Sequence, residues 1–173
     1  MKLKQKHFIP FMLVLAGITT IGIIISSFSF KNKQQVEFEE NVAVSDSLLT
    51  MELPRIGQDG MLKLNEWQGE EQVLVFWASW SEKSEALMKE ITQFSAAYDD
   101  SSLQIIAALV MDVTESKPDP SEFPGFIYVD GTRLYNHLKV PGIPTYIYLK
   151  RGKVAHTHVG YEIGAGLDTL KAY

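Results

Sequence analysis

The chain opens on a long uncharged apolar run, Phe8–Phe30 (FIPFMLVLAGITTIGIIISSFSF). The run is about long enough to cross a hydrocarbon layer of roughly 30 Å as a helix, so it predicts a transmembrane anchor over residues 1–30. A cleaved signal peptide, whose apolar region has only about 7–15 residues, is the alternative. Three lysines precede the run and two follow it. This slight excess favours a cytoplasmic N-terminus and an extracytoplasmic C-terminal part.

The next segment, residues 31–50 (KNKQQVEFEENVAVSDSLLT), is polar and acidic and has no clear periodicity. Such a composition is typical of a solvated linker. From Met51 onward the pattern becomes that of a folded domain, residues 51–173. This domain begins with two short extended stretches on either side of the turn signal Asp59-Gly60.

The remaining pattern predicts an α/β domain. Val73–Ala78 (VLVFWA) is a continuous apolar run, as expected of a strand buried on both faces. A helix of about 16 residues is expected to begin near Ser81, because apolar residues follow it at helical spacing. Further strands are expected at 103–111, 126–129, 145–149 and 153–159, a short helix at 131–138 and weak helical character at 163–172, with a proline-rich loop at 112–125. This order describes a mixed sheet flanked by helices.

Charge and composition narrow the function. The 173 residues carry a formal charge of -5, and since residues 1–30 hold three lysines and no acid, the remaining 13 basic and 21 acidic residues give -8. An acidic domain is a poor partner for nucleic acid. The cysteine count is zero, which excludes disulfides, thiolate catalysis, iron–sulfur clusters and cysteine-ligated zinc. No cofactor is expected.

Two motifs carry a family resemblance. VLVFWASWSEKSEALMKEI resembles the active-site strand, turn and helix of the thioredoxin-like superfamily, where F-W-A-x-W-C-x-x-C is the hallmark. VPGIPTYIYLKRGKVAHTHVG resembles the family's cis-proline segment and the hairpin after it, with Pro144 at the proline position. The apolar N-terminus and FPGFIYVDGTRLYNHLKVPGIPT resemble, more narrowly, the membrane-anchored TlpA/ResA-like branch. The resemblance implies a thioredoxin-like fold, a single-pass location in a bacterial cell membrane, and relatives that are thiol-disulfide oxidoreductases.

The chain departs from this family in its chemistry. Ser81 and Ser84 stand at both cysteine positions, and a hydroxyl cannot replace the thiolate that attacks sulfur in disulfide exchange. The resemblance also implies that the acid before the Phe-Trp pair falls on Val75 and that the acid one turn past the second cysteine falls on Leu87. No catalytic residue is therefore expected, although the family activity leaves open whether this polypeptide is an enzyme.

The serines have simpler interpretations. The Ser81 hydroxyl is suited to accept from an amide of the first helical turn, and Ser79-x-x-Glu82 fits a capping box. Neither Ser81 nor Ser84 lies in a G-x-S-x-G elbow, and no histidine is placed by the sequence to activate it. A nucleophilic role is therefore disfavoured.

Histidine and tryptophan side chains offer weaker candidates. His156-x-His158 puts two imidazoles on one face of a strand, a possible metal pair. Because no third ligand is indicated, ordinary half-exposed strand histidines are preferred and no metal is expected. Trp67, Trp77 and Trp80 are more typical of core and rim packing than of a ligand box.

In the family that this chain resembles, an extended peptide lies between the active-site turn and the proline loop and pairs with the backbone before the proline. The corresponding positions here are Trp80, Ser81, Gly142, Ile143 and Pro144. The first hypothesis is a membrane-tethered, redox-inactive protein that binds an extracytoplasmic peptide or protein there. The alternatives are a thiol-disulfide oxidoreductase whose cysteines were lost or mutated, and a structural subunit of a membrane complex. Pro144 is equally explained by the needs of its turn.

Overall fold

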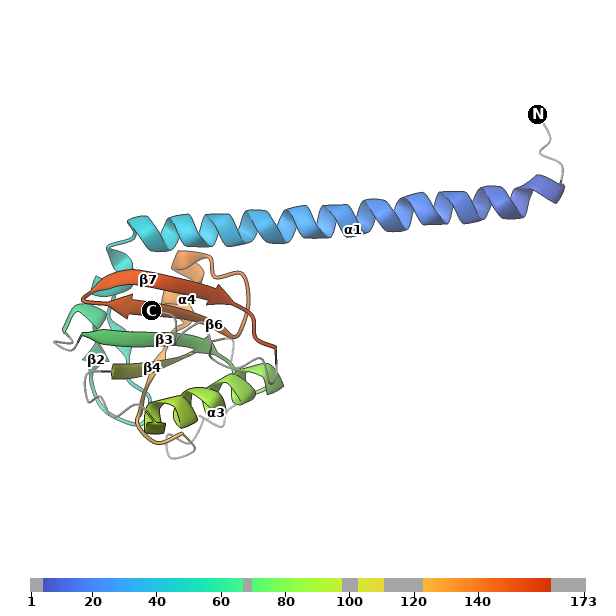
Figure 1. Ribbon diagram of the computed structural model, residues 1–173. Coiled ribbons are helices and arrows are strands. Elements are labelled where there is room, and N and C mark those ends of the chain that lie inside the picture. Colours follow the sequence, from blue (N-terminus) through green and yellow to red (C-terminus); the bar gives the residue numbers. More distant parts are fainter. Residues whose placement is uncertain (1–4, 67–69, 98–102, 111–122, 163–173) are drawn as a thin grey trace.

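The computed structural model describes residues 5–66, 70–97, 103–110 and 123–162 (Figure 1). The expected helix at 163–172 and most of the proline-rich loop lie outside these residues. In chain order the elements are α1 Gln5–Val44, α2 Ser47–Thr50, β1 Leu53–Pro54, β2 Met61–Leu62, the 3-10 helix η1 Leu64–Glu66, β3 Glu71–Trp77, α3 Glu82–Ala97, β4 Leu103–Leu109, β5 Phe126–Asp130, α4 Thr132–Leu138, β6 Thr145–Lys150 and β7 Lys153–Val159.

A five-stranded mixed sheet forms the centre of the domain, with the strand order β5-β4-β3-β6-β7. β3 pairs parallel with β4, and β4 pairs parallel with β5. β6 runs antiparallel to both of its neighbours, β3 and β7. Every residue of β3 from Gln72 to Trp77 is buried, as the uninterrupted apolar run predicted. The α/β prediction is confirmed.

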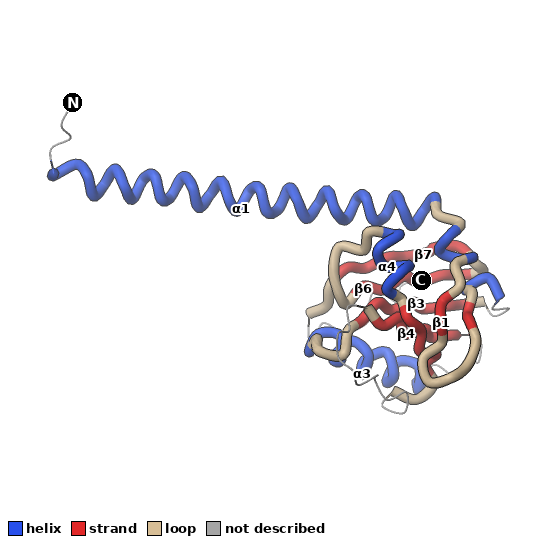
Figure 2. The backbone as a smooth tube through the Cα atoms, turned by 180° about the vertical axis from the view of Figure 1, so that it is seen from behind, coloured by secondary structure: helices blue, strands red, loops and turns tan. Residues whose placement is uncertain are grey.

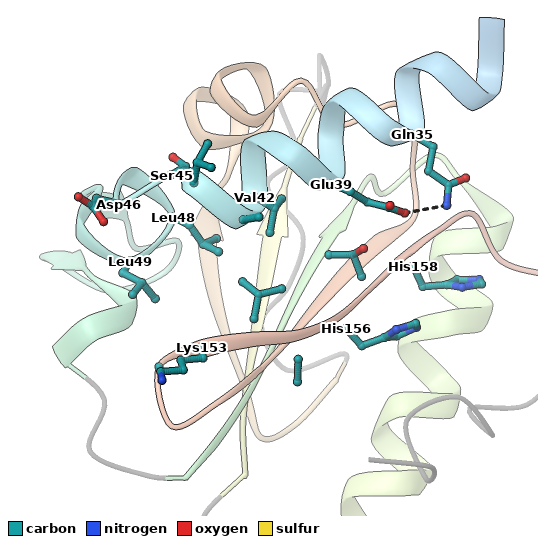
Figure 3. Close-up of a pocket in the computed structure, with 16 residues that line it drawn as sticks. Gln35, Glu39, Val42, Ser45, Asp46, Leu48, Leu49, Lys153, His156 and His158 are labelled. Atoms are coloured by element: carbon teal, nitrogen blue, oxygen red, sulfur yellow. Dashed lines mark hydrogen bonds between the residues drawn. The ribbon is translucent and has the colours of Figure 1, made fainter. Parts of the chain in front are cut away.

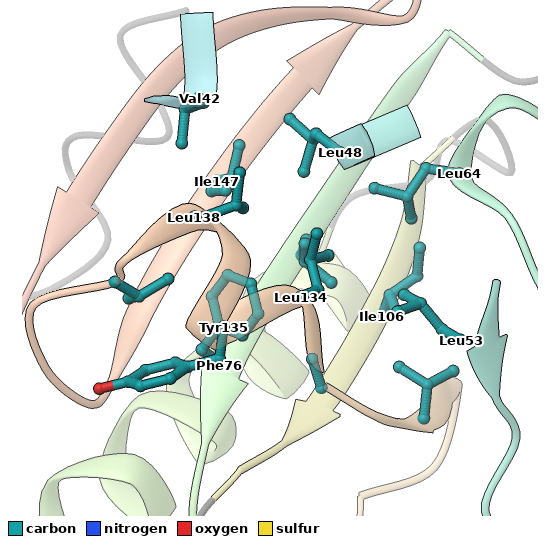
Figure 4. Close-up of a cluster of buried hydrophobic side chains, with 14 of the residues drawn as sticks. Val42, Leu48, Leu53, Leu64, Phe76, Ile106, Leu134, Tyr135, Leu138 and Ile147 are labelled. Carbon is teal, nitrogen blue, oxygen red and sulfur yellow. The ribbon is translucent and has the colours of Figure 1, made fainter. Parts of the chain in front are cut away.

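Helices cover both faces of this sheet. α3 lies on one face, while α4, α2 and the C-terminal part of α1 lie on the other (Figures 1 and 2). α3 spans 16 residues, close to the predicted helix, and contributes Leu87 and Ile91 to the cluster on its side. The opposite cluster joins sheet residues such as Phe76 to Leu134 and Leu138 of α4 (Figure 4). The short β1/β2 hairpin flanks the Asp59-Gly60 turn, as predicted.

The solvated linker expected over residues 31–50 is not what the structure has. Helix α1 runs for 40 residues, well past the apolar segment. Phe38 and Val42, one helical turn apart, are 0% and 3% exposed and join the α4-side cluster together with Leu48 of α2. Asn41 Nδ2 donates a hydrogen bond to the Leu138 carbonyl at 3.2 Å. The segment is therefore acidic on its outer face and part of the core on its inner face.

The first part of α1 makes no such contact. Its side chains from Ile9 to Phe30 are exposed, and by length and composition the helix is able to cross a membrane. A signal sequence near the N-terminus would satisfy the same criterion.

We expect Phe38→Ala to lower the free energy of unfolding by about 3–5 kcal/mol, because it empties a fully buried aromatic site. Val36→Ala is the matched control on the same helix: Val36 is 52% exposed, so its truncation should change stability by less than about 0.5 kcal/mol. Urea unfolding of the detergent-solubilised chain, followed by tryptophan fluorescence, measures both. Equal effects of the two substitutions would show that α1 does not belong to the core.

Candidate functional site

The candidate site lies at one end of the sheet. β3 finishes at Trp77 and β6 starts at Thr145, and their antiparallel pairing sets Phe76 opposite Thr145. The chain leaving β3 and the loop entering β6 therefore meet at this end. The Ile143–Pro144 peptide bond is cis, and the Pro144 carbonyl accepts a hydrogen bond from the Gly160 amide at 2.8 Å, just past β7.

Ser81 is the N-cap of α3. Its Oγ accepts a hydrogen bond from the Ser84 amide at 3.3 Å, and its carbonyl accepts one from the Glu85 amide at 3.0 Å. An N-cap serine satisfies an otherwise unpaired amide of the first turn in this way. The predicted capping role of Ser81 is confirmed. The capping box with Ser79 as the cap is wrong, because α3 begins at Glu82, directly after Ser81.

Ser84 supports the same turn from the inside. It is 0% exposed, and its Oγ accepts a hydrogen bond from the Ala78 amide at 3.4 Å. The Ser81 amide in turn donates to the Ala78 carbonyl at 3.1 Å. Both hydroxyls thus stabilise the link between β3 and α3, with Ser81 half-buried and Ser84 fully enclosed.

At this turn and the loop before β6 we define the Trp80 surface by Trp80, Ser81, Gly142 and Ile143. Pro144, which was also expected at this surface, is buried beneath it. Trp80 is 59% exposed, whereas Ile143 is half-buried and packs against the α4-side cluster. Thr145 Oγ1 donates a hydrogen bond to the Gly142 carbonyl at 2.7 Å, which holds the loop. The surface therefore combines an exposed tryptophan on the turn after β3 with a hydrogen-bonded loop and a partly buried aliphatic side chain before β6.

Trp77 does not contribute to this surface. Trp77 is only 3% exposed, and its ring packs edge-on against Tyr128 with centroids 6.1 Å apart, so it is a core residue as predicted. Trp67 lies outside the described residues.

The interior under the turn is apolar at the two positions where the resemblance places acids. Val75 and Leu87 are both 0% exposed and pack in the cluster between β3 and α3. Neither position offers a carboxylate to move a proton to or from the turn.

The two strand histidines pack against an aromatic ring. His156 and His158 lie with their ring centroids 6.1 Å and 5.3 Å from that of Tyr146 and 6.4 Å from each other. Burial, followed by the neighbouring His158, lowers the pKa of His156 below its ordinary 6.5, while Glu39 acts in the opposite direction. Within the part of the chain that the structure describes, no three His, Cys, Asp or Glu side chains are placed to hold a metal ion.

A groove that sequence reasoning missed runs between α1, α2 and β7, with a volume of about 830 Å³ (Figure 3). Gln35 and Glu39 of α1 lie on one wall, with a hydrogen bond of 3.0 Å between their side chains. Lys153 and His158 of β7 lie on the other wall. The groove exists because the C-terminal part of α1 packs against the sheet. In the sequence, the two apolar residues 38 and 42, one helical turn apart, were the available sign of this packing.

No protein-family model and no curated protein sequence matches the chain. Solved structures do match. A protein from Chlorobium tepidum described as the thiol:disulfide interchange protein DsbE is 25% identical, with a TM-score of 0.59 over 70% of this chain and 88% of that one. StoA from Bacillus subtilis is 18% identical, with a TM-score of 0.53 over 69% and 92%. A secreted disulfide oxidoreductase from Mycobacterium tuberculosis is 15% identical, with a TM-score of 0.58 over 74% and 96%.

These neighbours establish the class of the protein. The chain has a thioredoxin-like fold, preceded by a long apolar helix, and it has no cysteine. The fold expected from the sequence resemblance is therefore confirmed.

We expect Ser81→Ala to lower the free energy of unfolding by about 1 kcal/mol, because the amide of Ser84 loses its acceptor. Ser81→Asp is the matched control, since aspartate is an equally good N-cap and its charge suits the helix N-terminus. Thermal unfolding followed by circular dichroism measures both variants. A loss of stability in the aspartate variant as large as that in the alanine variant would contradict the capping role.

Proposed function

We propose that the protein is a membrane-anchored, redox-inactive thioredoxin-like protein that binds an extended peptide or protein segment at the Trp80 surface, outside the cytoplasm. The observation that carries this proposal is the state of the two serines. At the positions of the family's redox cysteines, both hydroxyls accept backbone hydrogen bonds within the turn, while the adjacent Trp80 stays exposed.

No residue of this chain can act as the nucleophile of a thiol–disulfide exchange. A thiolate must attack the substrate disulfide to form a mixed disulfide, and a second thiol must then release the reduced substrate, so that the pair gives up two electrons and closes as a disulfide. The sequence has no cysteine, and the buried Val75 and Leu87 leave the turn without the nearby acids that the family resemblance implies. Binding, unlike exchange, needs only the surface and the backbone.

The geometry suits a main-chain mode of recognition. The loop before Pro144 is held by the Thr145–Gly142 hydrogen bond and by the Pro144–Gly160 hydrogen bond. A segment in extended conformation would pair with the backbone of this loop, and its side chains would pack on the Trp80 ring and on Ile143. Because the loop is already ordered, little conformational entropy would be lost on the protein's side.

The proposed location follows from α1. The exposed apolar part of the helix would span the bilayer as a single-pass anchor, with the three N-terminal lysines in the cytoplasm. The folded domain would then lie on the outer face of a bacterial cell membrane. The long uncharged run favours an uncleaved anchor over a cleaved signal peptide.

The binding test uses peptides selected from a displayed random library on the purified protein. Trp80→Ala and Ile143→Asp should each weaken their binding by roughly thirtyfold, the effect of a hot spot worth about 2 kcal/mol. Val154→Asp is the control, because Val154 is 37% exposed on β7, away from the Trp80 surface. Isothermal titration supplies the affinities, and the melting temperature shows whether each variant is folded. Undiminished binding by a folded Trp80→Ala variant would mean that the peptides use another face.

A second candidate is a thiol-disulfide oxidoreductase whose cysteines were replaced by serines. The burial of the two serines supports this candidate. Ser81 is half-buried and Ser84 is fully buried, and cysteines at these positions would be suited to act as an attacking thiol and a resolving thiol.

For this candidate we expect the unmodified chain to reduce no protein disulfide with any thiol donor. Ser81→Cys with Ser84→Cys should close an intramolecular disulfide and give weak activity, because the helix N-terminus favours a thiolate but no acid assists the second thiol. Insulin reduction measures activity, and mass spectrometry measures the disulfide. Activity in the unmodified chain would refute the redox-inactive proposal.

A further inference from the structure

The direction of α1 relative to the sheet is the starting point. Along the α1–β7 groove, Gln35 and Glu39 lie over His158 and His156, whereas Asp46 lies toward the Lys153 end of the strand (Figure 3). α1 and β7 therefore run in opposite directions. The end at which β7 finishes points back toward the apolar part of α1.

The Trp80 surface lies at that same end. Val159, the last residue of β7, is paired with Thr145 at the start of β6, and Thr145 is paired with Phe76 near the end of β3. The arrowheads of β3 and β7 and the start of α3 lie at the end of the domain that is nearer the N-terminal half of α1 (Figure 1).

The separation between this end and a membrane would be small. From Phe30, the end of the apolar run, to Gln35 beside His158, α1 rises by only about 8 Å. The headgroup layer on each side of the hydrocarbon is itself roughly 5–8 Å thick. Because α1 is one continuous helix with Phe38 and Val42 seated in the core, the domain has no hinge within the described helix to turn away.

We infer that α1 acts as a rigid support that holds the Trp80 surface against the outer face of the bilayer. There the Trp80 surface binds an extended polypeptide segment that lies along the membrane, such as the juxtamembrane segment of another membrane-anchored protein. This inference rests on the proposed function. An extended chain is about 5–10 Å thick and fits such a gap, whereas a folded domain of 100 residues, with a radius of gyration of about 13 Å, does not.

Charge disfavours the lipid surface itself as the partner. Residues 31–173 carry 13 basic and 21 acidic side chains, so anionic headgroups would repel the domain. The exposed Trp80 and the half-buried Ile143 are better matched to apolar side chains of a polypeptide.

The orientation is tested with the full chain in nanodiscs that carry a nitroxide quencher on the lipid headgroup. Since the chain has no cysteine, Lys83→Cys and Lys153→Cys each give one fluorophore position, at opposite ends of the domain and both exposed. The label at position 83 should be quenched severalfold more than the label at position 153. Equal or reversed quenching would overturn the inference, and the peptide affinities of the Trp80→Ala variant would still stand as the separate test of the proposed function.

The partner is tested by a photo-crosslinking amino acid at position 80 of the full chain in native membranes. The matched control carries the same crosslinker and an insertion of about two helical turns after Lys33, which lifts the domain by roughly 10 Å without changing its facing. The expected adducts are polypeptides that stay in carbonate-washed membranes and that disappear in the lifted chain.

Each other result has a defined meaning. Adducts with soluble polypeptides that persist in the lifted chain would overturn the inference and leave the proposed function intact. If the crosslinker forms lipid adducts and the label at position 83 is still quenched after the insertion, the Trp80 surface binds the bilayer and not a polypeptide, which would overturn the inference. The absence of any adduct in the unlifted chain would overturn both proposals.

Discussion

The position of β3 is the constraint on which the rest of the structure depends. This strand is hydrogen-bonded to β4 on one side and to β6 on the other, and both of its faces are covered by helices. A strand enclosed in this way has to leave the sheet abruptly at its end. The chain does so at Ala78, whose carbonyl and amide are both bonded within the turn. The antiparallel β6 then brings the Pro144 loop to the same place.

The turn explains how a thioredoxin-like scaffold folds without sulfur at these two positions. In a redox protein of this family, the free amides and dipole of the helix N-terminus would favour a thiolate. Here the Ser84 amide donates to the Ser81 hydroxyl oxygen, and serine is among the best capping residues. The buried Ser84 hydroxyl serves the Ala78 amide. The residues that abolish disulfide exchange therefore preserve the local fold, and with it the surface around Trp80.

The parts of the fold that depend on local pattern were predictable from the sequence. The unbroken apolar run of β3 and the amphipathic spacing of α3 each signal their element within a few residues, and the Ser81 cap follows from its place just ahead of that helix. The docking of α1 was not predictable in the same way. Its contacts are with residues about a hundred positions away, such as that of Asn41 with Leu138. In addition, its two buried apolar side chains stand among many acidic residues, so the local composition is that of a solvated segment.

This missed contact alters the physical picture of the anchor. A solvated linker would let the domain sample all orientations, so that a partner at the membrane would meet the Trp80 surface only in a fraction of them. A continuous helix with Phe38 and Val42 in the core restricts those orientations at no cost during binding, because the ordering entropy was already lost when the domain folded. Exposed acidic side chains of α1, such as Glu40, keep the segment hydrated while its inner face is buried. In the proposed membrane-anchored arrangement, the helix would therefore determine both how close the Trp80 surface lies to the bilayer and which way it faces.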